Sequence, residues 1–257
     1  MSFLGDLIWI ESRKAWRSRI PLISALGFLI MPIASAFLIF VIKNPQLARQ
    51  LGLVSAKANI LVSAADWPAY LKLVAEACAM GGFFLFCLIT SWTFGREFAD
   101  HTVKDLLAVP VPRLSLLLAK FFVVTIWSIA LAVEIYLVSM VVGWLLRLDG
   151  GTSSALLDGS IILLIAVALA IVSVTPFAFL ASVGRGYLLP LGIVVLIAIV
   201  SNLVAVAGWG DYFPWSVAGM VTQGEPLAPV SYVIVLLTGL VGILLTYLWW
   251  MRADQSR

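Results

Sequence analysis

Six apolar stretches, each long enough to cross a lipid bilayer as a helix, constrain this chain more than any other feature. They cover residues 20–42, 69–94, 114–146, 155–183, 187–207 and 230–251. A helix rises about 1.5 Å per residue, so about 20 apolar residues span the roughly 30 Å hydrocarbon core of a membrane. Apolar residues make up 63% of the chain and charged residues only 11%, whereas soluble domains are about half apolar and a quarter charged. We therefore expect one all-α integral membrane domain, residues 1–257, with six transmembrane helices.

Prolines and cysteines inside these stretches do not change that expectation. Pro32, Pro176 and Pro190 lie inside or at the edge of a stretch, and membrane helices tolerate such kinks because neighbouring helices supply new hydrogen-bond partners. Cys78 and Cys87 lie nine residues apart, on opposite faces of a helix, so we expect separate buried thiols. With a single histidine in the chain as well, we expect no metal site.

The distribution of lysine and arginine predicts the orientation, because these residues are enriched in cytoplasmic loops. With the N-terminus inside, eleven of them would be cytoplasmic and five external. The cytoplasmic set is Arg13, Lys14, Arg17, Arg19, Arg96, Lys104, Arg113, Lys120, Arg185, Arg252 and Arg257, and the external set is Lys43, Arg49, Lys57, Lys72 and Arg147. We therefore expect both termini on the cytoplasmic side of the cell membrane. The short basic clusters suit phospholipid headgroups and do not form the basic face that nucleic acid requires.

Residues 1–18 precede the first apolar stretch and are too charged to cross the membrane. Their apolar residues share one side of a helix, although Glu11 and Lys14 fall on that same side. We interpret the segment as an interfacial helix along the inner leaflet, with Trp9 and Trp16 at the level of the headgroups. A frayed basic tail is the alternative.

Residues 208–229 contain neither lysine nor arginine, which favours an external position. The segment is rich in aromatic and turn-forming residues. Aromatic side chains at the membrane interface explain this composition. A short re-entrant hairpin that closes the outer end of a pathway is the alternative.

The connection between the second and third stretches, residues 95–113, is short and rich in charges of both signs. Asp100 or Thr102 can cap a short amphipathic helix whose apolar ridge contains Leu106 and Leu107, and two prolines end it. Such a helix, held parallel to the membrane between two transmembrane helices, can transmit a push from a soluble partner. The alternative is an ordinary solvated loop that turns the chain.

The same connection resembles that of the membrane subunits of type-2 ABC exporters, particularly the bacitracin-permease-like group. In these proteins the second and third helices are joined by Arg-Glu-aromatic, a turn, Thr, a basic residue, two leucines, Pro, Arg and a later Lys. The matching residues here are Arg96, Glu97, Phe98, Thr102, Lys104, Leu106, Leu107, Pro110, Arg113 and Lys120. The family often has Gly before the Thr, where this chain has His101.

The resemblance implies that residues 95–113 contain a coupling helix, which sits in a cleft of a separate ATP-hydrolysing subunit. The ATPase-coupling residues would be Arg96, Glu97, Phe98, Thr102, Lys104, Leu106, Leu107, Pro110 and Arg113. It also implies two permease copies, identical or related, that work with two ATPase subunits to export an amphipathic peptide, an antibiotic or a lipid.

The sequence agrees that the ATPase is a separate chain. A phosphate-binding loop requires Gly-Lys followed by Ser or Thr, and none of the six lysines follows a glycine. We therefore expect a non-catalytic subunit with no cofactor of its own, whose partner binds ATP and Mg²⁺.

Glu134 is the charged residue deepest inside an apolar stretch. An ionised carboxylate there costs several kcal/mol unless it is paired or hydrated. Glu134 either lines the substrate route or gates it, or else it is protonated or hydrogen-bonded between helices.

Two other functions fit an integral membrane chain. A secondary transporter that works without an ATPase would usually show inverted repeats, broken helices and several polar groups at the membrane midplane. A membrane enzyme acting on lipids would need clustered His, Asp or Ser residues, and His101 has no obvious partners. A permease subunit of an ABC exporter accounts for more of the sequence.

Overall fold

The computed structural model describes residues 3–44, 46, 65–102, 111–224 and 227–252. Within these ranges every regular element is a helix. In chain order they are α1 (Phe3–Arg17), α2 (Ile20–Lys43), α5 (Trp67–Ala77), η1 (Cys78–Gly82), α6 (Phe83–Ala99), α8 (Arg113–Leu145), α9 (Ser153–Ser173), α10 (Thr175–Val183), α11 (Leu188–Val206), η2 (Gly210–Tyr212), α12 (Val217–Gln223) and α13 (Pro229–Arg252).

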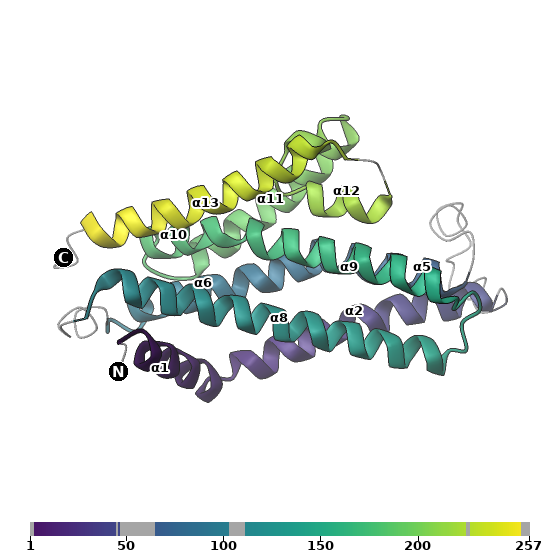
Figure 1. The fold of residues 1–257 in the computed structure, drawn as a ribbon, viewed down its shortest axis with the longest axis horizontal. Coiled ribbons are helices and arrows are strands. Elements are labelled where there is room, and N and C mark those ends of the chain that lie inside the picture. Colours follow the sequence, from purple (N-terminus) through teal and green to yellow (C-terminus); the bar gives the residue numbers. More distant parts are fainter. Residues whose placement is uncertain (1–2, 45, 47–64, 103–110, 225–226, 253–257) are drawn as a thin grey trace.

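Six helical segments are long and apolar enough to cross a membrane. They are Ile20–Lys43, Trp67–Ala99, Arg113–Leu145, Ser153–Val183, Leu188–Val206 and Pro229–Arg252. Each coincides within a few residues with a stretch predicted from the sequence, which confirms the all-α architecture with six candidate spans. The two termini lie at the same end of the bundle, as an even number of spans requires (Figure 1).

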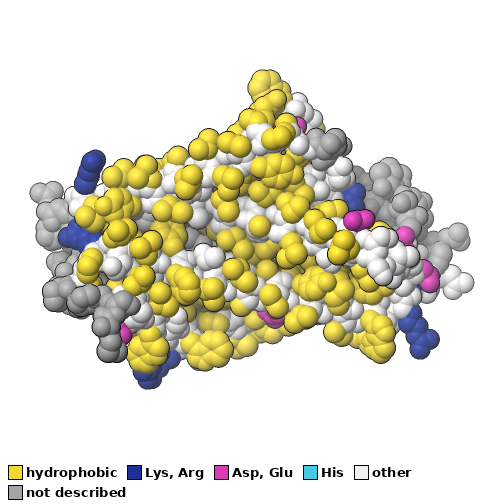
Figure 2. Space-filling model, viewed as in Figure 1, with side chains coloured by type: hydrophobic (Ala, Val, Ile, Leu, Met, Phe, Trp, Pro, Cys, Tyr) yellow, Lys and Arg dark blue, Asp and Glu magenta, His cyan; other side chains and the backbone are white. Residues whose placement is uncertain are grey.

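The outer surface of the bundle is apolar over most of its length (Figure 2). Leu22, Leu164, Leu196 and Leu240, from four different spans, each expose more than half of their side chain. Charged side chains gather mainly towards the two ends. Exposing such an apolar surface to water costs free energy, whereas contact with lipid does not. The chain is therefore a multi-pass membrane protein.

The fourth span is broken into α9 and α10 at Val174, two residues before Pro176. Proline has no N–H to donate, so the carbonyl groups of the preceding turn lose a partner. The Thr175 hydroxyl bonds the carbonyl oxygens of Val172 at 3.0 Å and Gly239 at 2.9 Å, which ties the break to α13. Gly242 allows this approach, since a Cβ there would lie 2.5 Å from the Pro176 nitrogen.

The second span runs through α5, the π-helical turn η1 and α6 without a break. Cys78 begins the π-helical turn, and both cysteines are buried and free. The core of the bundle is built on this span: Tyr70, Phe86 and Phe94 are fully buried, and Phe86 packs against Phe28 of α2 with ring centroids 5.0 Å apart.

The chain turns back after α11 to form η2 and the short helix α12. Val217, Ala218 and Val221 of α12 are buried against Leu169 of α9 and Ala79 of η1. The segment thus packs beside helices of the bundle (Figure 1). Whether it enters the membrane from outside, as a re-entrant segment, stays a prediction.

Candidate coupling site

The connection between α6 and α8 begins with a left-handed turn at His101. Its φ is +58°, while the Thr102 N–H donates to the Glu97 carbonyl at 2.9 Å and the His101 N–H to the Phe98 carbonyl at 3.3 Å. This pair of bonds is the Schellman arrangement that commonly ends helices, and glycine is its usual left-handed residue. His101 therefore takes the backbone conformation that glycine would adopt without strain.

Four charged side chains meet inside the protein just before this turn, and we call them the ion cluster: Glu11, Lys14, Glu97 and Lys120. The Lys120 ammonium group is completely buried, and it donates to Glu97 Oε1 at 2.7 Å, Glu11 Oε2 at 3.1 Å and the Thr93 carbonyl at 3.0 Å. Lys14 Nζ donates to Glu11 Oε1 at 2.7 Å and lies 3.3 Å from Glu97 Oε1.

The ion cluster is neutral overall, with two carboxylates and two ammonium groups. Burying a single charge costs several kcal/mol, and only close partners with good geometry offset that cost. Lys120 uses all three of its N–H donors, so its burial is fully compensated. Glu97 Oε2 is the exception, because it has no hydrogen-bond partner among the described residues.

The ion cluster explains the imperfect pattern of α1. Glu11 and Lys14 lie on the apolar side of that helix, which packs against α8. There Lys120 of α8 forms an ion pair with Glu11, and Lys14 pairs with the same carboxylate. Burial raises the pKa of the Glu11 carboxyl, but the attraction of Lys120 and Lys14 outweighs it and leaves the pKa below its ordinary value. Glu11 is therefore ionised at neutral pH.

The ends of α6, α8 and α13 are joined beside the ion cluster. The ring of Phe98 packs edge-on against Trp250 with centroids 5.8 Å apart, and Arg113 Nη1 donates to the Trp250 carbonyl at 2.7 Å. A cation at the last turn of α13 also suits the negative end of the helix dipole. Trp250 Nε1 in turn donates to the Ser182 hydroxyl of α10 at 3.0 Å.

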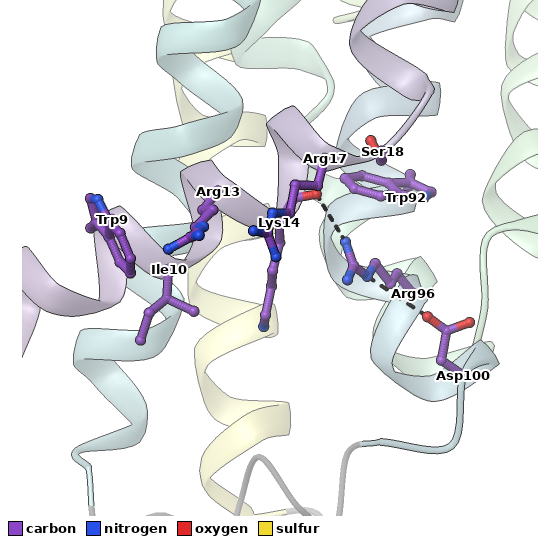
Figure 3. Close-up of a pocket in the computed structure, with 9 residues that line it drawn as sticks. All are labelled: Trp9, Ile10, Arg13, Lys14, Arg17, Ser18, Trp92, Arg96 and Asp100. Atoms are coloured by element: carbon purple, nitrogen blue, oxygen red, sulfur yellow. Dashed lines mark hydrogen bonds and ion pairs between the residues drawn. The ribbon is translucent and has the colours of Figure 1, made fainter.

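Arg96 lies on the outer side of α6, away from Lys120. Its guanidinium stacks over the Trp92 ring at 5.0 Å, donates to the Lys14 carbonyl at 3.4 Å and lies 3.7 Å from Asp100 (Figure 3). At this level a Cβ on Gly95 would collide with the Gly186 backbone at 2.7 Å, so the α10–α11 turn also rests on α6.

The structure thus brings some predicted coupling residues together and leaves others apart. Glu97, Phe98 and Arg113 are engaged with neighbouring helices, and Thr102 is exposed at the end of the bundle. The remaining predicted residues, Lys104, Leu106, Leu107 and Pro110, lie outside the described residues. Their helix and its docking role stay predictions.

Glu134 lies at a separate site, on a groove of about 580 Å³ between α8 and the α1–α2 corner. The walls are mostly apolar and include Trp16, Leu22 and Trp127. Glu134 is half-buried, and no described side chain pairs with it. Its carboxylate is therefore free to meet a molecule that enters the groove.

Among the described residues, no group of three or more His, Cys, Asp and Glu side chains is placed to hold a metal ion.

Comparison with known proteins identifies the family. The family model described as "ABC-2 family transporter protein" matches residues 7–201, well over half of the chain. The chain belongs to the ABC-2 transporter family. Among curated proteins it is similar to the bacitracin transport permease protein BCRB of Bacillus licheniformis, with 29% identity over 174 residues, which cover 66% of this chain and 84% of that protein. This ABC-2 protein is accordingly a permease subunit, as its connection at residues 95–113 predicted.

Sequence reasoning missed the roles of Glu11, Lys14 and Trp250. The signal for the first two was present, because charged residues on the apolar side of an amphipathic helix need a buried partner. Trp250 gave no such signal, since an aromatic residue at the end of a span is ordinary.

Proposed function

We propose that this permease subunit belongs to an exporter in which a separate ATPase subunit binds ATP and Mg²⁺ and drives the transmembrane helices. The ATPase docks on residues 95–113, and its movement passes into α6 and α8. The ion cluster carries this proposal, because it fastens both ends of the connection to α1.

A force from the ATPase on residues 95–113 can move the transmembrane helices only if the connection is rigidly attached to them. Glu97 lies two residues before the end of α6 and Lys120 lies near the start of α8, and their ion pair holds these two helices together. Lys14 and Glu11 connect α1 to this ion pair. Arg113 and Phe98 connect α8 and α6 to Trp250 of α13. A force on the connection then moves four helices as one body.

The proposed coupling residues divide into two groups. Lys104, Leu106, Leu107 and Pro110 belong to the short coupling helix, and with Thr102 they make the contacts to the ATPase. Arg96, Glu97, Phe98 and Arg113 support the connection from inside the permease. In this scheme Glu97 positions the coupling helix and does not touch the partner.

We propose that the cargo is an amphipathic peptide, antibiotic or lipid, and that Glu134 contacts it in the groove. The groove pairs apolar walls with one unpaired carboxylate, which suits an amphiphile carrying a cationic or hydrogen-bond-donating group. The name of the Bacillus licheniformis relative, a bacitracin transport permease, makes bacitracin the first cargo to test.

The proposed assembly contains a second permease, identical or related, and two ATPase subunits. Both termini, α1 and the coupling helix lie on the cytoplasmic side, and residues 208–229 lie at the outer side, where α12 forms a re-entrant segment. Eleven of sixteen basic residues on the side of the termini support this orientation.

The docking proposal is tested by Leu106→Asp, in a chain co-expressed with its ATPase partner. An ATPase with a phosphate-binding loop encoded by a neighbouring gene is the natural candidate. We expect the variant to lose ATPase co-purification and cargo-stimulated ATP hydrolysis, because a carboxylate replaces an apolar docking contact. The melting temperature should stay unchanged.

The matched control is Tyr212→Asp, which places the same charge on an exposed residue at the opposite end of the bundle. It should keep the ATPase bound. Unchanged co-purification in Leu106→Asp would remove the docking assignment, and transport by the purified permease alone would remove the ATPase from the proposal.

The cargo proposal is tested by Glu134→Gln in inside-out vesicles. We expect cargo uptake to fall at least tenfold while ATPase co-purification is unchanged, because the substitution removes a charge that faces the groove and nothing at the coupling site. Uptake at the wild-type rate would show that Glu134 does not contact the cargo.

A further inference from the structure

We propose that a recess between α1 and α6 binds the phosphate group of an anionic membrane phospholipid. The recess has a volume of about 480 Å³ (Figure 3), and apart from Ser18 it is lined by other residues than the groove of Glu134. Its walls carry four basic side chains and two tryptophans, namely Arg13, Lys14, Arg17, Arg96, Trp9 and Trp92. The proposal goes beyond the transport function and does not depend on the cargo.

The carboxylates that the structure describes do not balance the charges in the recess. Lys14 is neutralised in the ion cluster, and Arg96 has Asp100 at 3.7 Å. Arg13 and Arg17 line the same recess, and no described carboxylate lies within ion-pair distance of either guanidinium. Two positive charges therefore remain for an anion to neutralise.

Two of the guanidinium groups are already held in place. Arg13 stacks over Trp9 at 4.9 Å and Arg96 over Trp92 at 5.0 Å, one on each side of the recess (Figure 3). A stacked guanidinium keeps its N–H donors free at the edge, where they fit the oxygens of a phosphate in pairs. Because the stacking fixes these groups beforehand, less rotamer entropy is lost when the phosphate binds.

The position of the recess indicates a lipid headgroup. Ser18 lies in its wall, and α2 begins two residues later at Ile20, where the apolar outer surface starts with Leu22 and Ile23, both more than half exposed. Tryptophan beside lysine and arginine at the end of a span is typical of the headgroup region. The recess therefore lies at the depth where phospholipid phosphates are found.

An apolar path for the acyl chains leads away from the recess along α6. Leu88 and Leu85 follow Trp92 at helical spacing, each partly exposed, and Phe84 continues the stripe with 38% exposure. A free phosphate would leave this stripe unused, and an acidic protein surface could not reach along it. A glycerophospholipid occupies both the cationic recess and the stripe.

The experiment compares retention of dioleoyl phosphatidylglycerol and dioleoyl phosphatidylcholine by the full chain, using native mass spectrometry from a neutral detergent. We expect the wild-type chain to retain one phosphatidylglycerol in preference to phosphatidylcholine. The double variant R13Q/R17Q should lower this preference by about 25-fold, from roughly fivefold for each of the two basic side chains that meets an anionic headgroup. Both residues are exposed, so the melting temperature without lipid should not change.

The matched control is Arg19→Gln, which removes the same charge two residues from Arg17 at a position that does not line the recess. We expect it to keep most of the preference. An equal loss of the phosphatidylglycerol preference in Arg19→Gln would show that the lipid is held by diffuse electrostatic attraction, and it would overturn the proposed site.

Two further results would also overturn it. Displacement of the lipid by excess inorganic phosphate would make this a free-phosphate site. Retention of the lipid preference by R13Q/R17Q, together with loss of ATPase co-purification, would make the recess a protein-docking surface.

Discussion

Glu97 and Glu134 both lie on long apolar helices, yet their surroundings are opposite. Glu97 is 3% exposed, and two lysines lie within 3.3 Å of one of its oxygens. Glu134 is half-buried on a groove, and no described cation pairs with it. A carboxylate that is already neutralised can hold helices together, while an unpaired one at a groove is available to a ligand. The paired carboxylate of Glu97 thus marks the end of the bundle where we propose that the ATPase acts. The unpaired carboxylate of Glu134 marks the groove where we propose that cargo binds.

Removing Lys120 should produce the largest loss of stability. Lys120→Met leaves Glu97 and Glu11 buried with only Lys14 as a partner. We expect the free energy of unfolding to fall by about 3–5 kcal/mol, as for other buried pairs that lose one member. Thermal and denaturant unfolding in detergent would measure it.

The control for that variant is Lys72→Met on α5, where the lysine is exposed. We expect it to change stability by no more than about 0.5 kcal/mol. Equal effects of the two substitutions would show that the ion cluster does not hold the helices. Adding Glu97→Gln and Glu11→Gln to Lys120→Met should restore part of the loss, because no unpaired carboxylate then remains.

The stability added by Glu11 should depend on pH. The pKa of Glu11 is lower in the folded than in the unfolded protein, so its contribution is fully present above the unfolded value, near 4.5. The contribution is lost as the pH falls through the lower, folded value. Unfolding of the wild-type chain and of Glu11→Gln, compared from neutral pH downwards, should show a difference that shrinks in acid. A difference that grew in acid would reverse the assigned shift.

His101→Gly should stabilise the end of α6 by about 1 kcal/mol, because glycine adopts a positive φ without the strain that a side chain causes. The neighbouring Asp100→Gly, at φ −86°, should instead destabilise by a similar amount, since that position needs no left-handed residue. Thermal unfolding of the two variants would compare them directly. Destabilisation by both substitutions would argue against the left-handed turn.

Glu134→Gln should have the smallest effect on stability, within about 0.5 kcal/mol, because no partner is left unpaired. Unfolding in detergent would measure it beside Lys120→Met. A loss comparable to that of Lys120→Met would show that Glu134 has a structural partner and would remove the contrast between the two glutamates.

The sequence alone predicted the six spans to within a few residues, since an apolar run longer than the bilayer thickness has few ways to be buried except as a membrane helix. It also indicated the permease family, because the residues at 96–120 follow a local pattern. Local features of this kind need no knowledge of which helices are neighbours.

Only the tertiary structure decided that Glu11, Lys14, Glu97 and Lys120 meet at one point. These residues lie on three different helices, and helix periodicity gives the face of each residue but not the helix that it meets. Charges in an apolar environment must find partners, so the sequence could show that partners were required. The packing of α1 and α6 against α8 determined which side chains became those partners, and it left Glu134 without one among the described residues.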